Sequence, residues 1–264
     1  RFRILVMGRA NAGKTTILQR LCNTTDQPEI FDEKGQKVWN MHDTYLRLTI
    51  SLVRGYHKIE DELVFQSNPC FVFHDSCGFE AGSEEQFIMM KNFVMDCART
   101  PKLNKRIHAI WFCIPLTDIH RMVTAAETKF FEECDTGHVP VIVLLTKADA
   151  LELEAIEQLE DQELTVDETS VTALEKEILD NNIAKLKGWL NGFKFAPQCY
   201  LPLSGMDEEG GDCTPLLTCT ANALTEEKLQ ELLISTQQNN LGLCIEYAIL
   251  RLVVRFASLL SRMY

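Results

Sequence analysis

The stretch Gly8-Arg9-Ala10-Asn11-Ala12-Gly13-Lys14-Thr15 decides the fold of this chain. It matches G-x-x-x-x-G-K-[ST] in full and lies between an apolar run at 2–7 and a helical pattern that begins at Lys14. In such a loop the backbone N–H groups surround phosphate oxygens, and the helix N-terminus adds a positive dipole. The Lys14 ammonium can reach the β and γ phosphates, and the Thr15 hydroxyl can hold Mg²⁺. The sequence therefore predicts a nucleoside triphosphate site with contacts from Asn11, Ala12, Gly13, Lys14, Thr15 and Thr16.

Apolar runs alternate with helical patterns along most of the chain. The expected strands are 2–7, 70–74, 107–114, 139–145 and 216–220, with one more extended segment inside 27–55. The expected helices are 14–22, 84–99, 125–134, 173–190 and 225–236. Strands that are apolar throughout and alternate with helices form a parallel sheet covered on both faces. We therefore expect a three-layer α/β/α fold with a mostly parallel six-stranded sheet, and ligands at the carboxyl ends of its strands.

The charge of the chain is acidic and unevenly spread. The 264 residues carry a formal net charge of -12, with a pI of about 5.0, which argues against a nucleic-acid partner. Between residues 150 and 185 there are 11 Asp and Glu against 2 Lys. This segment is interpreted as a solvated helical insertion or as a docking surface for a basic partner.

The 10 cysteines contain no C-x-x-C pair and fall in apolar strands and helices. We expect free thiols in a chain of the reducing cytoplasm, with no signal peptide. No apolar run reaches the roughly 18 uninterrupted residues that a membrane span requires.

Three further motifs narrow the class of nucleotide. Asp75-Ser76-Cys77-Gly78 fits D-x-x-G, Thr146-Lys147-Ala148-Asp149 fits [NT]-K-x-D, and Thr220-Ala221-Asn222 is similar to an S-A-K turn. With the phosphate loop, these motifs make the chain resemble the P-loop GTPases of the Ras-like and Era-like branch. The stretch 74–82, with 54–57 upstream, is also similar to a set of fungal G-domain proteins. The resemblance implies a single G domain over 1–264, with a core at 1–149 and 214–236, an insertion at 150–213 and a C-terminal helix at 241–264.

The resemblance implies a role for each residue at the base end of the site. Asp149 would accept two hydrogen bonds from guanine, and Lys147 would lie over the base. Thr146 stands where Asn is commoner, and the Ala221 N–H would meet the guanine carbonyl beside Asn222. Thr220 would open that turn. An ATP-using P-loop kinase is the competing class, but it leaves Asp149 without a role.

The resemblance also implies the metal and switch residues. Thr15 and Asp75 would hold Mg²⁺, and the Gly78 N–H would contact the γ-phosphate. Lys14, Thr49 and Gly78 are the expected catalytic residues; Ser51 and Thr44 are the alternatives to Thr49 in the first switch. His74 is expected to pack in the core.

Phe79 occupies the position at which Ras-branch members carry the Gln that orients the attacking water. A phenyl ring can neither donate nor accept those hydrogen bonds, so we expect slow GTP hydrolysis until a partner or a second copy completes the site. The alternative is a nucleotide-gated oligomerising module with little intrinsic hydrolysis.

The expected helix at 241–264 is largely apolar, with a narrow polar stripe formed by Arg251, Arg255, Ser258 and Arg262. Three positions stay open for it: docked on the domain, forming a dimer surface, or facing a membrane.

Overall fold

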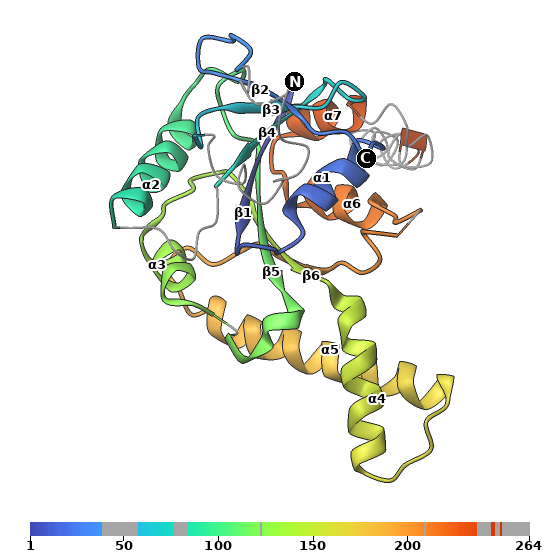
Figure 1. Cartoon of the computed structure of the whole chain (residues 1–264). Coiled ribbons are helices and arrows are strands. Elements are labelled where there is room, and N and C mark those ends of the chain that lie inside the picture. Colours follow the sequence, from blue (N-terminus) through green and yellow to red (C-terminus); the bar gives the residue numbers. More distant parts are fainter. Residues whose placement is uncertain are drawn as a thin grey trace, which may run out of the picture.

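A seven-stranded sheet with the order β2-β3-β4-β1-β5-β6-β7 runs through the molecule (Figure 1). The computed structural model describes residues 1–38, 58–76, 84–121, 123–208, 210–236, 244–245 and 249. The strands are β1 (Phe2–Gly8), β2 (Glu29–Phe31), β3 (Glu62–Val64), β4 (Phe71–Asp75), β5 (Ala109–Pro115), β6 (Val141–Thr146) and β7 (Cys199–Pro202). The five strands β4, β1, β5, β6 and β7 are parallel to one another. At the other edge, β3 pairs antiparallel with β4, and β2 pairs antiparallel with β3.

Helices cover both faces of this sheet, as Figure 1 shows. They are α1 (Lys14–Leu21), α2 (Glu84–Arg99), α3 (Ala125–Glu133), α4 (Leu151–Asp161), α5 (Glu168–Leu190), α6 (Thr214–Ala223) and α7 (Glu227–Ser235), with short 3-10 helices η1 (Leu116–Arg121) and η2 (Ala148–Ala150). One apolar cluster joins the sheet to α1, α6 and α7, and a second joins it to α2, α3, α4 and α5. The expected three-layer α/β/α fold is confirmed.

The alternation of side chains along the central strands explains the two clusters. In β1, Ile4 and Val6 belong to the first cluster, while Leu5 and Met7 belong to the second. Successive side chains of a strand point to opposite faces, so a strand covered on both sides is apolar at every position. Parallel pairing then aligns the carboxyl ends of these strands at one edge, with Val6 level with Asp75 and Pro115 level with Thr146.

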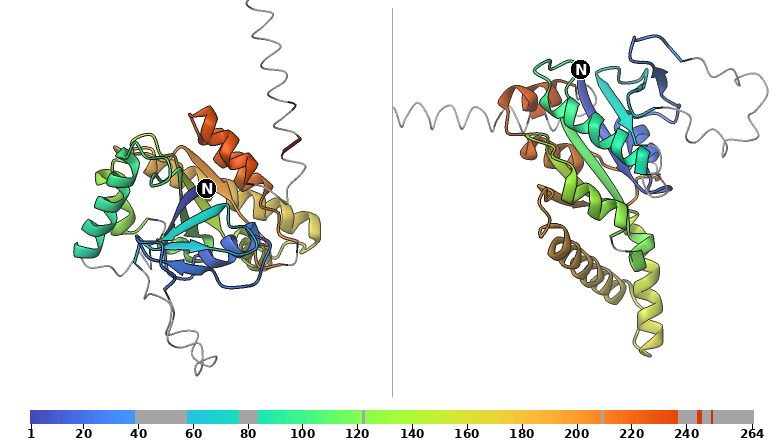
Figure 2. Two further views of the ribbon diagram at one scale, coloured as in Figure 1. Left: turned by 90° about the horizontal axis from the view of Figure 1, so that it is seen from above. Right: turned by 90° about the vertical axis from the view of Figure 1, so that its left-hand side faces the viewer.

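The acidic segment forms a helical hairpin of α4 and α5 that projects beyond the sheet (Figure 2). Asp167 caps α5, because its carboxylate accepts the Ser170 N–H at 2.8 Å. The helix expected at 173–190 is therefore confirmed, with a start five residues earlier than predicted.

The last strand was predicted in the wrong place. Residues 216–220 belong to helix α6, and the edge strand is β7, inside the segment expected to be an insertion. Pro202 ends β7, and all four of its residues are only half-buried, as is typical of an edge strand. An edge strand of this kind lacks the continuous apolar run that identifies a central one. The sheet accordingly has seven strands instead of six, and the insertion expected to extend to residue 213 ends before β7.

The expectation that all cysteines are free thiols is also wrong. Cys199 on β7 and Cys219 on α6 form a disulfide. The two residues are 20 positions apart in sequence, and they meet because α6 returns along β7. The other described cysteines form no disulfide. Burial raises the pKa of Cys22, Cys113 and Cys134 to about 12, which keeps these thiols neutral.

Two expected elements fall outside the described residues. The first is the extended segment predicted inside 27–55, of which residues 39–55 are not described. The second is the C-terminal helix predicted at 241–264, of which only Cys244, Ile245 and Ile249 are described. Within the part of the chain that the structure describes, none of the helices combines the length and the apolar character needed to cross a bilayer.

Candidate functional site

The phosphate loop lies where the sequence predicts it, between the end of β1 and the start of α1. Three of its residues have positive φ: Gly8 at 134°, Asn11 at 59° and Gly13 at 77°. A Cβ on Gly8 would lie 2.2 Å from the carbonyl oxygen of Cys113 on β5. The loop therefore closes tightly against the neighbouring strand, and only glycine fits at its first position.

The N-terminus of α1 is open toward this loop. Gly13 is the N-cap residue and supplies no side-chain hydrogen bond, and the first turn contains no acidic residue. The first N–H groups of a helix have no partner within the helix, and together with the helix dipole they attract an anion. Thr15 and Thr16 lie in this first turn, and Thr15 is exposed. This end of α1 can receive phosphate oxygens.

Lys14 is held over the loop by two backbone carbonyls. Its ammonium donates to the Gly8 oxygen at 3.0 Å and to the Arg9 oxygen at 2.8 Å. The Arg9 oxygen also accepts the Ala12 N–H at 3.3 Å. The positive charge therefore already lies at the centre of the loop, where bound phosphates would need it.

Asp75 ends β4 beside β1, level with Val6. The adjacent Ser76 donates its N–H to the Val6 oxygen at 3.2 Å, and the Ser76 hydroxyl is buried without a hydrogen-bond partner among the described residues. The Asp75 carboxylate and the Thr15 hydroxyl are hard oxygen donors, the type that Mg²⁺ prefers. Mg²⁺ is commonly bound through one carboxylate plus substrate phosphates and water, so these two residues fit that ion.

Two strand-end loops meet at the other side of the phosphate loop. The Ala148 N–H donates to the Leu203 oxygen at 3.0 Å, and the Gly205 N–H donates to Asp149 Oδ1 at 3.1 Å. Asp149 is exposed, and Lys147 has the left-handed φ of 57° that turns the chain sharply after β6. The loop after β6 and the loop after β7 therefore form one unit around the Asp149 carboxylate.

Thr146 contributes a buried hydroxyl to this unit. The residue is 2% exposed, and within the described part of the chain its Oγ1 has no hydrogen-bond partner. Buried hydroxyls are nearly always satisfied in folded proteins. The Thr146 hydroxyl, at the carboxyl end of β6, is therefore a candidate hydrogen-bonding group for a ligand.

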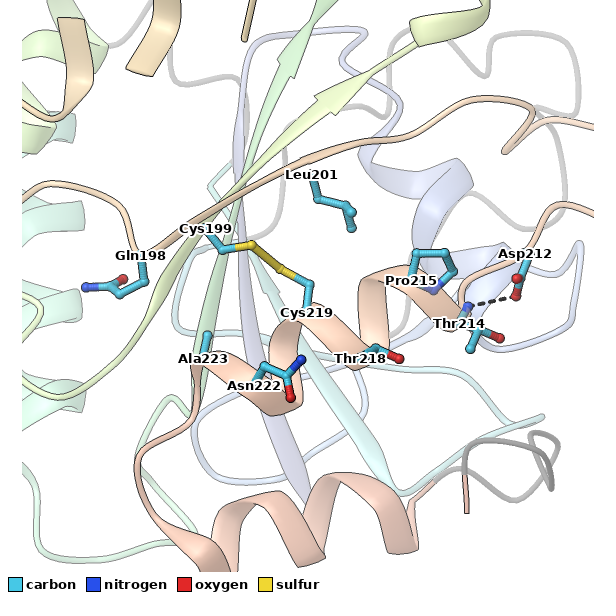
Figure 3. Close-up of a pocket in the computed structure, with 10 residues that line it drawn as sticks. All are labelled: Gln198, Cys199, Leu201, Asp212, Thr214, Pro215, Thr218, Cys219, Asn222 and Ala223. Carbon is cyan, nitrogen blue, oxygen red and sulfur yellow. Dashed lines mark hydrogen bonds between the residues drawn. A yellow bond between two sulfur atoms is a disulfide. The ribbon is translucent and has the colours of Figure 1, made fainter. Parts of the chain in front are cut away.

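The turn predicted at Thr220-Ala221-Asn222 is wrong. These residues belong to α6, and the Thr220 hydroxyl donates to the Leu216 oxygen at 2.7 Å and accepts the Trp111 Nε1–H at 3.1 Å in the core. A cavity of about 640 Å³ lies beside the Cys199–Cys219 disulfide. Asn222 is one of its lining residues (Figure 3). Cys199 begins β7, and Asn222 follows Cys219 on α6, so Asn222 lies toward the amino end of β7, whereas Asp149 lies at the carboxyl edge of the sheet.

Ser204 and Gly205 take the place that was expected for Thr220 and Ala221. They follow β7 directly, and Gly205 has a left-handed φ of 61°. The available signal was a Ser-Gly pair after the short run 199–203, but the expectation of a long insertion concealed it. The loops that lie together at this end of the candidate site are thus 146–149 and 203–205.

The prediction that His74 packs in the core is confirmed. Its ring is buried, with Nδ1 3.0 Å from the Ile59 oxygen and Nε2 3.3 Å from an Arg3 guanidinium nitrogen. Burial, together with the positive charge of Arg3, lowers the pKa of His74 to about 4. The imidazole is therefore neutral near pH 7.

Several predicted site residues lie outside the described residues. They are the first-switch candidates Thr44, Thr49 and Ser51, together with Gly78 and Phe79 after β4.

The comparisons with known proteins give structural neighbours alone. Neither a protein-family model nor a curated protein matches the sequence. The chain is similar to a variant of Era from Aquifex aeolicus bound to GDP.AlF4-, with 14% identity and a TM-score of 0.40 over 85% of this chain and 57% of that one. It is also similar to a GTP-binding protein from the hyperthermophilic archaeon Sulfolobus solfataricus in complex with GDP, with 13% identity and a TM-score of 0.36 over 88% of this chain and 53% of that one. The chain thus spans little more than half the length of either structure.

Proposed function

We propose that this chain is a guanine-nucleotide-binding switch protein that binds GTP and GDP with Mg²⁺ and hydrolyses GTP slowly without a partner. The observation that carries the proposal is the hydrogen bond from Gly205 to Asp149. It joins the loops after β6 and β7 at the same edge of the sheet as the phosphate loop. A carboxylate at this edge can accept hydrogen bonds from the N–H groups of a base, whereas its negative charge would repel a phosphate.

The chemistry of the carboxylate favours guanine. Guanine presents two adjacent donors, N1–H and the 2-amino group, and a carboxylate accepts both. Gly205 occupies one lone pair of Oδ1, and a carboxylate offers about four acceptor sites, so room remains for the base. Adenine lacks this donor pair. Each hydrogen bond to a charged group contributes about 1.5–3 kcal/mol.

The phosphates would occupy the loop and the N-terminus of α1, with Lys14 turning from the Gly8 and Arg9 carbonyls toward them. Thr15 and Asp75 would hold Mg²⁺, which neutralises phosphate charge when bound. In this proposal Gly78 and Thr49 close on the γ-phosphate, and the triphosphate state differs from the diphosphate state through those contacts.

Titration calorimetry tests the nucleotide assignment. GDP and ADP are titrated with Mg²⁺ into the wild-type protein and into Asp149→Ala. We expect GDP to bind far more tightly than ADP, and the substitution to weaken GDP binding by about 10²-fold or more, because two charge-assisted hydrogen bonds are lost. Asp135→Ala is the matched control, since its carboxylate lies in a loop at the opposite end of β6. Equal affinities for GDP and ADP would overturn the guanine assignment.

A nucleotide-gated assembly module is the second candidate, and Phe79 and the apolar segment 241–264 favour it. The two candidates differ in how turnover depends on protein concentration. A switch whose site a second copy completes shows a specific rate that rises with concentration. An assembly module shows nucleotide-dependent oligomers while its GTP turnover remains close to background. Sedimentation with GDP and with a slowly hydrolysed GTP analogue, run beside the rate measurements, separates them.

A further inference from the structure

A buried ion pair ties the phosphate loop to helix α3. Arg9 follows Gly8 in the loop, and its guanidinium donates through Nε to Glu127 Oε1 at 2.9 Å and through a second nitrogen to Oε2 at 3.1 Å. Both side chains are 1% exposed. The same guanidinium lies 3.3 Å from the Asp118 carboxylate in η1. Two parallel N–H···O bonds fix the direction of the arginine as well as its position.

The other end of the pair is also fixed. Glu127 Oε2 accepts the Thr124 N–H at 2.7 Å, and the Glu127 N–H donates to the Thr124 hydroxyl at 3.3 Å. This reciprocal capping box sets the carboxylate at the first turn of α3. The Glu127 carboxylate is therefore held in place by its own helix, and it sets the position of the Arg9 guanidinium.

The backbone of Arg9 connects this pair to the phosphate site. The Arg9 carbonyl accepts both the Lys14 ammonium and the Ala12 N–H. Its side chain points away from the loop, into the space between α3 and η1, while its carbonyl faces the loop interior. Holding the guanidinium thus fixes the peptide against which Lys14 rests.

Stability alone does not explain a buried charged pair at this position. Replacing such a pair with apolar residues of similar volume is often neutral or stabilising, whereas removing one partner leaves an uncompensated buried charge. A buried pair of this kind can instead serve to impose a particular geometry.

We propose that Glu127 is a positioning residue for nucleotide binding, which acts through Arg9 to hold the phosphate loop in the shape that receives a nucleoside diphosphate or triphosphate. This inference rests on the proposed function for the identity of the base, but not for the role of the loop. Glu127 touches no phosphate; it fixes the backbone that does.

The test separates positioning from mere stability. Glu127→Gln removes the charge and keeps the volume, and the double variant Arg9→Met with Glu127→Leu removes both charges and keeps an apolar filling. Glu133→Gln is the control, because it lies on the same helix and breaks only the exposed pair with Lys91. For each protein the thermal midpoint is measured, together with the affinities for GDP and for inorganic tripolyphosphate, which carries no base.

We expect Glu127→Gln to lower both affinities by about 10–100-fold, because the loop then occupies its binding-competent shape for a smaller fraction of the time. The double variant should recover part of the thermal midpoint that Glu127→Gln loses but none of the affinities, and Glu133→Gln should change neither. Wild-type affinities in the double variant, or equal effects of the two glutamine variants, would overturn the inference. If GDP shows no advantage over ADP, the guanine assignment fails, and the tripolyphosphate affinities still decide the role of Glu127.

Discussion

Gly8 is the residue at which the phosphate loop depends most on the absence of a side chain. Its φ of 134°, and the 2.2 Å that would separate an added Cβ from the Cys113 oxygen, leave no space for alanine. We predict that Gly8→Ala abolishes measurable GDP binding and lowers the thermal midpoint, because the loop must move off β5. Calorimetry and thermal unfolding measure the two effects.

Gly188 offers the control for that substitution. It lies in α5, has no atom within 4 Å of an added Cβ, and has no positive φ. Gly188→Ala should leave GDP affinity unchanged and raise the free energy of unfolding by about 0.5–1 kcal/mol. A Gly8→Ala protein that bound GDP like the wild type would contradict the loop geometry.

Two buried histidines predict how stability depends on pH. Burial lowers the pKa of His74 and of His108 to about 4, below the ordinary value of 6.5. The unfolded chain therefore binds more protons than the folded one between about pH 6.5 and pH 4, so the free energy of unfolding falls as the pH falls through this window. The slope approaches the order of 1 kcal/mol per pH unit for each imidazole.

Urea unfolding between pH 7.5 and pH 4.5 checks this dependence. His108 accepts the Arg3 N–H at 3.1 Å and contacts the Leu103 oxygen at 3.1 Å, so His108→Gln is chosen to remove the titrating group while keeping polar contacts. The variant should show a shallower pH dependence than the wild type. Identical slopes would show that His108 is not held neutral.

At the scale of elements, helix α6 supplies core packing instead of a nucleotide contact. The Thr220 hydroxyl satisfies the buried Trp111 indole N–H. Thr220→Val leaves that donor unpaired, which should cost about 1–3 kcal/mol of stability, with GDP affinity unchanged. Asn222→Ala, at an exposed position of the same helix, should change neither quantity. A loss of GDP affinity without a loss of stability in either variant would support the nucleotide contact at 220–222 that the sequence predicted.

The sequence predicted elements well where the signal is local. The phosphate loop, β1 and α1 are one continuous motif, and α2 has the same bounds that its pattern predicted, 84–99. It failed at 216–220, where Leu216, Leu217, Thr220 and Ala221 are buried at helical spacing, and a short apolar run cannot be told from a strand by its hydrophobicity. The prediction failed at β7 because this half-buried strand is only four residues long and contains Pro202, which a central strand avoids.

At the scale of the whole molecule, the site is an edge formed by separate parts of the chain. In the proposed function, residues 8–16 bind phosphate, 75 and 15 suit Mg²⁺, and 146–149 with 203–205 surround the base position. A tetrapeptide such as 146–149 is visible in the sequence because it follows its own strand. The pairing of Arg9 with Glu127 spans 118 residues and could not be predicted, because it depends on how α3 packs.

Removal of the metal should affect the two nucleotide states differently. Thr15 and Asp75 would hold a Mg²⁺ ion that neutralises phosphate charge, and a triphosphate carries more of that charge than a diphosphate. We therefore predict that EDTA weakens binding of a slowly hydrolysed GTP analogue more than it weakens GDP binding. Asp75→Ala should abolish that difference, and Asp135→Ala, in the loop at the opposite end of β6, should preserve it. Equal effects of EDTA on both nucleotides would contradict the assignment of Thr15 and Asp75.

The most direct test of the central claim exchanges the base that Asp149 reads. In Asp149→Asn an acceptor oxygen becomes an NH₂ donor, which suits xanthine, since xanthine has a carbonyl where guanine has its 2-amino group. Affinities for GDP and xanthosine diphosphate are measured by calorimetry on the wild type and on this variant. The account predicts a reversal, with GDP preferred by the wild type and xanthosine diphosphate by the variant. An unchanged preference would show that Asp149 does not read the base.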